Sequence, residues 1–145
     1  MTTDVRKPLP DRADIDNGQF WAGTDKAELQ VKHCGDCSRY HWPPRLGCPY
    51  CGSGKVEWVC VAAKGELFSW TVVHRTQTPG FENQTPYAVV LVELRDAKGV
   101  RMIGNLVSCT LDKLHAGLAM EAVFTPAADG SVTLVNWEPA AGALG

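Results

Sequence analysis

The sequence predicts a mainly β protein with a short N-terminal helix, a zinc ribbon and a five-stranded OB-type barrel. Two CxxC pairs, Cys34/Cys37 and Cys48/Cys51, have the spacing of a zinc ribbon. Short apolar segments separated by turn residues then continue to residue 138, with a possible helical turn between the third and fourth. An SH3-like barrel or a small sandwich is the structural alternative. The expected boundaries are a lead-in and helix at 1–27, the ribbon at 28–62, the barrel at 63–138 and a tail at 139–145.

The composition is that of a globular protein without a basic excess. The chain has 145 residues, 45% hydrophobic and 21% charged, with a formal net charge of −2. This length suits one domain with a real core, or a small module beside a modest one. Nucleic-acid-binding proteins usually carry excess positive charge, and membrane spans need about 18 or more apolar residues; the sequence shows neither. Residues 1–16 lack the apolar segment of a signal peptide, so we expect a cytoplasmic protein.

The first predicted element is a short helix. Asp16 is expected to cap it, and it would run through Phe20 and Trp21 and end before Gly23 and Thr24. Two large apolar side chains on so short an element must pack on the rest of this chain or on another chain.

The four spaced cysteines predict a metal site within a small sheet. Leu29 and Val31 alternate with polar residues on the way to the first pair, and a second strand is expected at residues 56–61. Each CxxC pair places two thiolates on one tight turn, and two pairs complete a tetrahedron of sulfurs that suits zinc. Four thiolates leave no open position for water or substrate, so the predicted role of the zinc is structural.

Other readings of this region remain open. The run Cys-Pro-Tyr-Cys-Gly at 48–52 also has the look of a rubredoxin iron site, which would make the protein red. His33 and His41 flank the cysteines but are expected to lie outside the coordination sphere. Cys60 and Cys109 stand in apolar surroundings, where a small buried thiol is the simplest interpretation.

Five strands are expected in the barrel, at 66–74, 87–94, 100–107, 120–124 and 132–137. In the first, Phe68, Trp70 and Val72 alternate and should share the core face. The second, YAVVLVEL, is apolar almost throughout, as in a strand covered on both sides. Gly104 marks a bulge or tight bend in the third. Residues 111–115 suit a helical turn ended by Gly117, and the pair at 129–130, Asp-Gly, predicts a hairpin turn.

Several of these segments, taken in order, resemble one family. The chain is similar to small bacterial and archaeal proteins with a rubredoxin-like zinc ribbon fused to an OB fold, encoded beside thiolase-type enzymes. The segments that carry the resemblance are Phe20-Trp21; Cys34-x-x-Cys37 followed by Trp42-Pro43-Pro44-Arg45; Cys48-Pro49-x-Cys51-Gly52; Gly65-Glu66-Leu67-Phe68-Ser69-Trp70-Thr71; Pro86-Tyr87-Ala88-Val89-Val90-x-Val92-Glu93-Leu94; and Gly117 before Met120-Glu121-Ala122-Val123-Phe124. One departure is the hairpin at 96–99, which is slightly longer and more polar than the family pattern.

The resemblance implies a non-catalytic subunit of a thiolase-superfamily enzyme. Such enzymes include acyl-CoA thiolases, acyltransferases and the aldolases that shorten steroid side chains held as CoA thioesters. The family implies that the catalytic residues belong to the larger partner. The small subunit would stabilise that thiolase-like partner and help form its acyl-CoA site, with zinc as its own structural cofactor. A heterotetramer of two large and two small subunits is expected from the family.

Four side chains are candidates for contact with a partner or with CoA. Phe20 and Trp21 could bury themselves on another chain. Arg45 could meet a CoA phosphate or belong to a solvated ribbon surface. Phe81 stands in a long link at 75–85, where it could anchor a partner or fold back over the barrel.

Two competing functions belong to other classes. A zinc ribbon with an OB barrel could bind single-stranded nucleic acid, which requires a basic groove with exposed stacking aromatics. The barrel aromatics are instead expected in the core: Phe68, Trp70, Phe124 and Trp137. A free-standing enzyme such as a CoA hydrolase needs a nucleophile beside a base, but His74 and His115 have no such neighbour in the sequence. No catalytic residue is therefore predicted.

Overall fold

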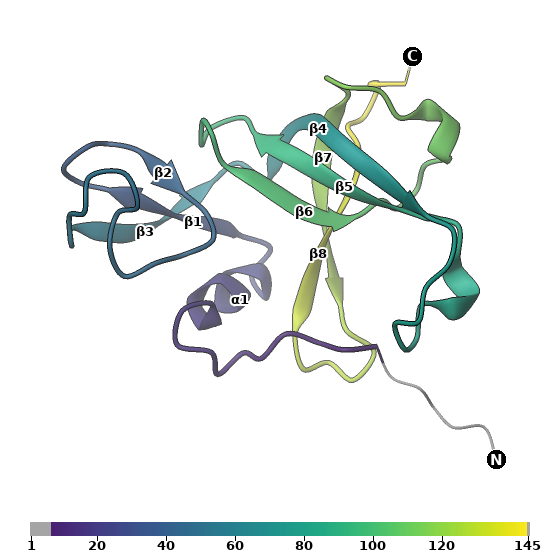
Figure 1. Ribbon diagram of the computed structural model, residues 1–145, viewed down its shortest axis with the longest axis horizontal. Helices are drawn as coiled ribbons and strands as arrows, with labels where there is room; N and C mark the ends of the chain where they lie inside the picture. Colours follow the sequence, from purple (N-terminus) through teal and green to yellow (C-terminus); the bar gives the residue numbers. More distant parts are fainter. Residues whose placement is uncertain (1–6, 145) are drawn as a thin grey trace.

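The computed structural model of the protein describes residues 7–144, so the first six residues of the predicted lead-in lie outside the described part. A helix and a three-stranded sheet precede a five-stranded barrel (Figure 1). The helix and first sheet are α1 (Gly18–Thr24), β1 (Leu29–Cys34), β2 (Tyr40–His41) and β3 (Val56–Val61). The barrel contains β4 (Lys64–Val73), η1 (Glu82–Gln84), β5 (Tyr87–Leu94), β6 (Arg101–Asn105), η2 (Leu111–Lys113), β7 (Ala119–Pro126) and β8 (Thr133–Pro139).

The barrel has the strand order of an OB fold. Its neighbours run β6-β5-β4-β7-β8, all antiparallel. A parallel bridge between Leu106 and Trp137 joins the end of β6 to β8 and closes the barrel. The 3-10 turn η2 lies between β6 and β7, which are the third and fourth barrel strands. The predicted fold class, a zinc ribbon followed by a five-stranded OB-type barrel, is thus confirmed.

The helix α1 differs from the prediction at both ends. Asn17, not Asp16, occupies the N-cap position, and its side chain makes no cap hydrogen bond. Instead the Asp14 carboxylate accepts the amides of Asp16 and Asn17, each at 2.8 Å, and so fixes the turn that leads into the helix. The helix also continues beyond its predicted end before Gly23 and includes both Gly23 and Thr24. In the described part of the chain, no helix combines the length and the apolar character that a membrane crossing would require.

A β-bulge in β4 overturns the predicted core face of that strand. Leu67 pairs with Val92, and Ser69 pairs with Leu91, the residue before Val92. Phe68 is therefore the extra residue of the bulge. The extra residue shifts the alternation of the residues that follow it, so Ser69 faces outward and Trp70 faces inward. Phe68 follows the inward-facing Leu67 and lies on the outer face, 46% exposed, so its predicted place in the core is wrong. Trp70 does face inward, opposite buried Val90, but stays 37% exposed.

Gly104 is required by packing and not by a bulge. It lies within the regular pairing of β5 with β6. A Cβ on Gly104 would come within 2.7 Å of Trp137 Cδ1, closer than side chains approach in practice. Trp137 is completely buried. The glycine therefore provides room for the largest side chain of the core.

The helix joins the ribbon and the barrel into one packed unit. Phe20 is only 3% exposed, and its ring centroid lies 4.8 Å from that of Trp21 and 4.5 Å from that of Trp42. On the barrel side, the Thr24 hydroxyl donates to the carbonyl oxygen of Thr133 at 2.7 Å. The core is accordingly continuous from helix to barrel, and its buried members are Phe20, Leu29, Val31, Leu67, Ala88, Val90, Val92, Leu94, Ala97, Val100, Met102, Leu114, Leu118, Met120 and Trp137.

Candidate metal centre

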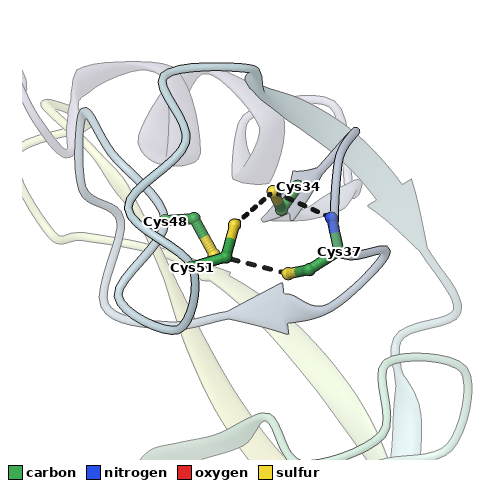
Figure 2. Close-up of side chains that lie close together, drawn as sticks. All are labelled: Cys34, Cys37, Cys48 and Cys51. Atoms are coloured by element: carbon green, nitrogen blue, oxygen red, sulfur yellow. Dashed lines mark hydrogen bonds between the residues drawn. The ribbon is translucent and has the colours of Figure 1, made fainter.

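The side chains of Cys34, Cys37, Cys48 and Cys51 converge on one point of the ribbon (Figure 2). Cys34 ends β1, and the other three lie on the loops between β1 and β3. All four sulfurs lie within 4.8 Å of one another. The shortest separations are 3.7 Å between Sγ of Cys34 and Cys51 and 3.6 Å between Sγ of Cys37 and Cys48. The structure thus brings together every predicted metal ligand.

These separations fit a metal and not a disulfide. A disulfide has sulfurs about 2.05 Å apart. Four sulfurs at about 2.3 Å from a central zinc ion form a tetrahedron with edges of about 3.8 Å. The observed Sγ pairs at 3.6 and 3.7 Å agree with that edge. The site therefore fits zinc. Four thiolates complete its tetrahedral coordination and leave no position for a substrate.

The two CxxC turns share one backbone pattern. In the first, the amide of Cys34 donates to the carbonyl oxygen of Arg39 at 2.9 Å. In the second, the amide of Cys48 donates to the carbonyl oxygen of Ser53 at 2.8 Å. Backbone N–H groups also point at the sulfurs, from Cys37 to Cys34 Sγ and from Tyr50 to Cys48 Sγ. Such donors stabilise thiolates, which are the form that binds metal.

The thiol pKa values reflect this shared environment. Burial raises the pKa of Cys48, but amides of Cys51 and Tyr50 together with neighbouring thiols lower it to about 7. For Cys51 the amide of Ser53 lowers the pKa, yet burial and the other three thiols outweigh it and raise the value to about 12. Four thiols this close cannot all ionise unaided, because the negative charges repel. A bound zinc ion supplies the positive charge that permits it.

A polar contact that the sequence did not predict connects the two turns. The Ser53 hydroxyl, after the second CxxC pair, donates to the Asp36 carboxylate inside the first pair at 2.5 Å. Lys55 Nζ lies 3.5 Å from the same carboxylate. Polar residues are ordinary in such turns, so the sequence does not single out Asp36 and Ser53 for this contact. Their contact fixes the distance between the two halves of the metal site.

The remaining cysteines and the nearby histidines stay outside the cluster. Cys60 is exposed on β3, so the prediction that its thiol is buried is wrong. Cys109 is partly buried. His33 packs against Tyr40 with tilted rings, whose centroids are 4.7 Å apart. His41 is buried, and neither ring nitrogen has a hydrogen-bond partner among the described residues.

The predicted contact residues are distributed over separate parts of the surface and core. Phe20 is buried within this chain, so it is not available as a surface contact. Trp21 is partly exposed beside it, and Arg45 is exposed on the loop after β2. Phe81 is partly buried, with its ring centroid 5.4 Å from that of Tyr87, and the ammonium of Lys7 lies 4.4 Å above its ring. The structure therefore favours the folded-back position of Phe81.

Two family models match the chain in consecutive segments. Residues 21–57 match the rubredoxin-like zinc ribbon domain of ChsH2, and residues 58–125 match the ChsH2 C-terminal OB-fold domain. The match to the zinc ribbon domain includes all four cysteines of the site. These segments meet within β3 and include the ribbon and the barrel strands up to β7, but not β8.

Curated relatives and solved structures agree with these matches. A DUF35 domain-containing scaffold protein of Methanothermobacter thermautotrophicus is 35% identical over 97 residues, which are 66% of this chain and 71% of that protein. A probable enoyl-CoA hydratase alpha subunit of Thermomonospora curvata is 34% identical over 125 residues; the match covers 86% of this chain but only 38% of that subunit. In a structure described as the Ltp2-ChsH2(DUF35) aldolase, one chain superposes with a TM-score of 0.78 and 31% identity, covering 90% of this chain and 99% of that chain. The chain therefore belongs to the ChsH2 (DUF35) family of zinc-ribbon and OB-fold proteins.

Proposed function

We propose that this chain is a non-catalytic accessory subunit that docks on a thiolase-like enzyme, stabilises it and helps form its acyl-CoA site. The observation that carries the proposal is the likeness, over 99% of its length, to a chain in the structure described as the Ltp2-ChsH2(DUF35) aldolase. The word scaffold in the name of the Methanothermobacter relative supports the same role. The name of the Thermomonospora relative, a probable enoyl-CoA hydratase alpha subunit, supports a CoA thioester as the substrate of the complex.

The chemistry of the metal centre is consistent with a subunit that leaves catalysis to its partner. Four cysteine ligands give zinc no open position at which to polarise a carbonyl or activate water. The zinc instead holds together a ribbon whose own sheet has only three strands. The reaction of the complex would be thiolytic or retro-aldol cleavage of a CoA thioester, with two large and two small subunits as the family pattern suggests.

The test is reconstitution with a thiolase-like protein from the same organism. Each protein is purified alone and after co-expression, and mass is measured by size exclusion with light scattering. We expect a colourless zinc protein without turnover of CoA esters when this chain is alone, and a stable active complex after co-expression. A thiolase-like protein that is equally stable and active without this chain would overturn the proposal.

Exposed aromatics give the nucleic-acid alternative one supporting observation. Phe68 and Trp70 are both partly exposed on β4. However, they lie on opposite faces of the strand, so they do not form one continuous stacking platform. A net charge of −2 also lacks the excess of cations that phosphate contacts need. Titration of labelled single-stranded DNA at physiological salt tests this, and we expect no binding.

A further inference from the structure

The strand β5 is apolar on its inner face and in the middle of its outer face, and the barrel covers only the inner face. Its inward side chains are buried in the core: Ala88, Val90, Val92 and Leu94. Its outward face carries Val89 and Leu91, which remain partly exposed. In Figure 1, β5 and β6 lie on the near side of the barrel, with no described element in front of them. An antiparallel sheet that faces water on one side normally has polar residues there, so this face is suited to a cover from outside the chain.

The apolar surface continues onto the two neighbouring strands. Leu91 pairs directly with Ile103 of β6, which is 64% exposed. Phe68, at the bulge in β4, lies on the same outer face, 46% exposed. We call these three side chains, Phe68, Leu91 and Ile103, the outer-sheet patch. Burial of such side chains by a partner is the main source of affinity in interfaces of this kind.

The charges beside the outer-sheet patch do not produce a positive surface. Arg101 Nε lies 3.3 Å from a carboxylate oxygen of Glu93, and its guanidinium stacks 3.7 Å from the ring centroid of Phe68. Glu66 pairs directly with Glu93 across β4 and β5, so the edge of the patch carries two carboxylates and one guanidinium and presents no excess positive field. An uncharged apolar protein surface complements it, whereas a phosphate backbone does not.

We propose that the outer-sheet patch is the docking surface for the thiolase-like catalytic partner, an inference that rests on the proposed function. The outside of a closed barrel curves away on both sides, so two copies of this face would touch along a narrow strip only. A larger partner with a concave apolar surface can cover all three side chains. The assembly named for the structurally similar chain, an Ltp2-ChsH2(DUF35) aldolase, supports such a partner over a second copy of this chain.

The test compares Ile103→Lys with a matched control, Ile15→Lys. Ile103 is exposed on the patch, whereas Ile15 is 92% exposed on the segment before α1, so both substitutions place the same charge on an exposed site. Each variant is purified and titrated with the same thiolase-like protein, and the dissociation constant is measured. Zinc content and unfolding midpoint verify that each variant folds.

We expect Ile103→Lys to weaken binding at least tenfold, while Ile15→Lys binds like the wild type. Equal binding by Ile103→Lys would overturn the docking surface and leave the proposed function intact. A wild-type chain that does not bind the thiolase-like protein at all would overturn both. If the chain alone forms a dimer that Ile103→Lys dissociates, a second copy occupies the patch and the inference is wrong.

Discussion

Ser38 takes in the first CxxC turn the place that Gly52 takes in the second. Each directly follows the second cysteine of its pair, and both have left-handed backbones, with φ of 62° and 76°. The amide of Ser38 donates to the carbonyl oxygen of Cys34 at 3.0 Å, and that of Gly52 donates to Cys48 at 2.9 Å. A residue with a Cβ is about 1–2 kcal/mol less stable in this conformation. Ser38 is therefore strained where Gly52 is not.

Relief of this strain should stabilise the protein. We expect Ser38→Gly to raise the free energy of unfolding by up to about 1 kcal/mol, because glycine also gains about 0.5–1 kcal/mol of freedom in the unfolded chain. Gly52→Ser should lower it. Urea unfolding at equal zinc concentration measures both. Gly54→Ala is the control, since a Cβ there meets nothing within 4 Å. A less stable Ser38→Gly protein would contradict the strain argument.

The metal assignment predicts different results for the two classes of cysteine. Cys34→Ser or Cys48→Ser should abolish stoichiometric zinc and unfold the ribbon, because structural zinc contributes on the order of 10 kcal/mol. Cys60→Ser is the matched control: Cys60 is exposed and outside the cluster, so zinc should remain. Elemental analysis and near-UV circular dichroism measure the two effects. A red protein with an iron–thiolate absorption would show that zinc is the wrong metal.

The contact between Gly104 and Trp137 predicts a costly small substitution. Gly104→Ala should lower the free energy of unfolding by about 1–3 kcal/mol, since the added methyl overpacks the core. The atoms in its way include Cδ1 and Nε1 of Trp137, at 2.7 and 3.0 Å. Trp137→Ala removes both of these atoms, so the cost of Gly104→Ala should be smaller in that background. Strict additivity in the double-mutant cycle would place the strain elsewhere.

Buried His41 predicts a pH dependence of stability. Burial lowers the pKa of His41 from 6.5. The positive charges of Lys32 and Arg45 lower it further, whereas the backbone of Arg45 acts to raise it. As pH falls through about 6.5, the unfolded chain takes up a proton on His41 while the folded chain does not, so stability decreases.

Comparison with His41→Phe isolates this contribution, because proton competition at the cysteines is common to both proteins. The stability of the wild type relative to His41→Phe should decrease between pH 7.5 and 5.5, measured by denaturant unfolding. His74→Gln is the control, since His74 is exposed. Parallel curves for the wild type and His41→Phe would contradict a depressed pKa.

The sequence by itself determined the metal centre and the order of the elements. Four cysteines at fixed short spacing act through local turns, so Cys34 to Cys51 could be assigned without knowledge of the fold. The hairpin turn at Gly130, with φ of 72°, was predictable for the same reason. Alternating apolar residues likewise located the barrel strands to within a few positions.

Only the tertiary structure decided which side chains face outward and what certain residues contact. The bulge at Phe68 depends on how β4 and β5 pair. The alternation of residues within one strand does not specify its register with the partner strand. Gly104 is needed because Trp137 and the carbonyl oxygen of Val135, both distant in sequence, lie against it. Phe20 is buried because α1 packs between ribbon and barrel, so a side chain that suggested a partner proved to be core. Such long-range contacts arise from packing, which sequence periodicity does not encode.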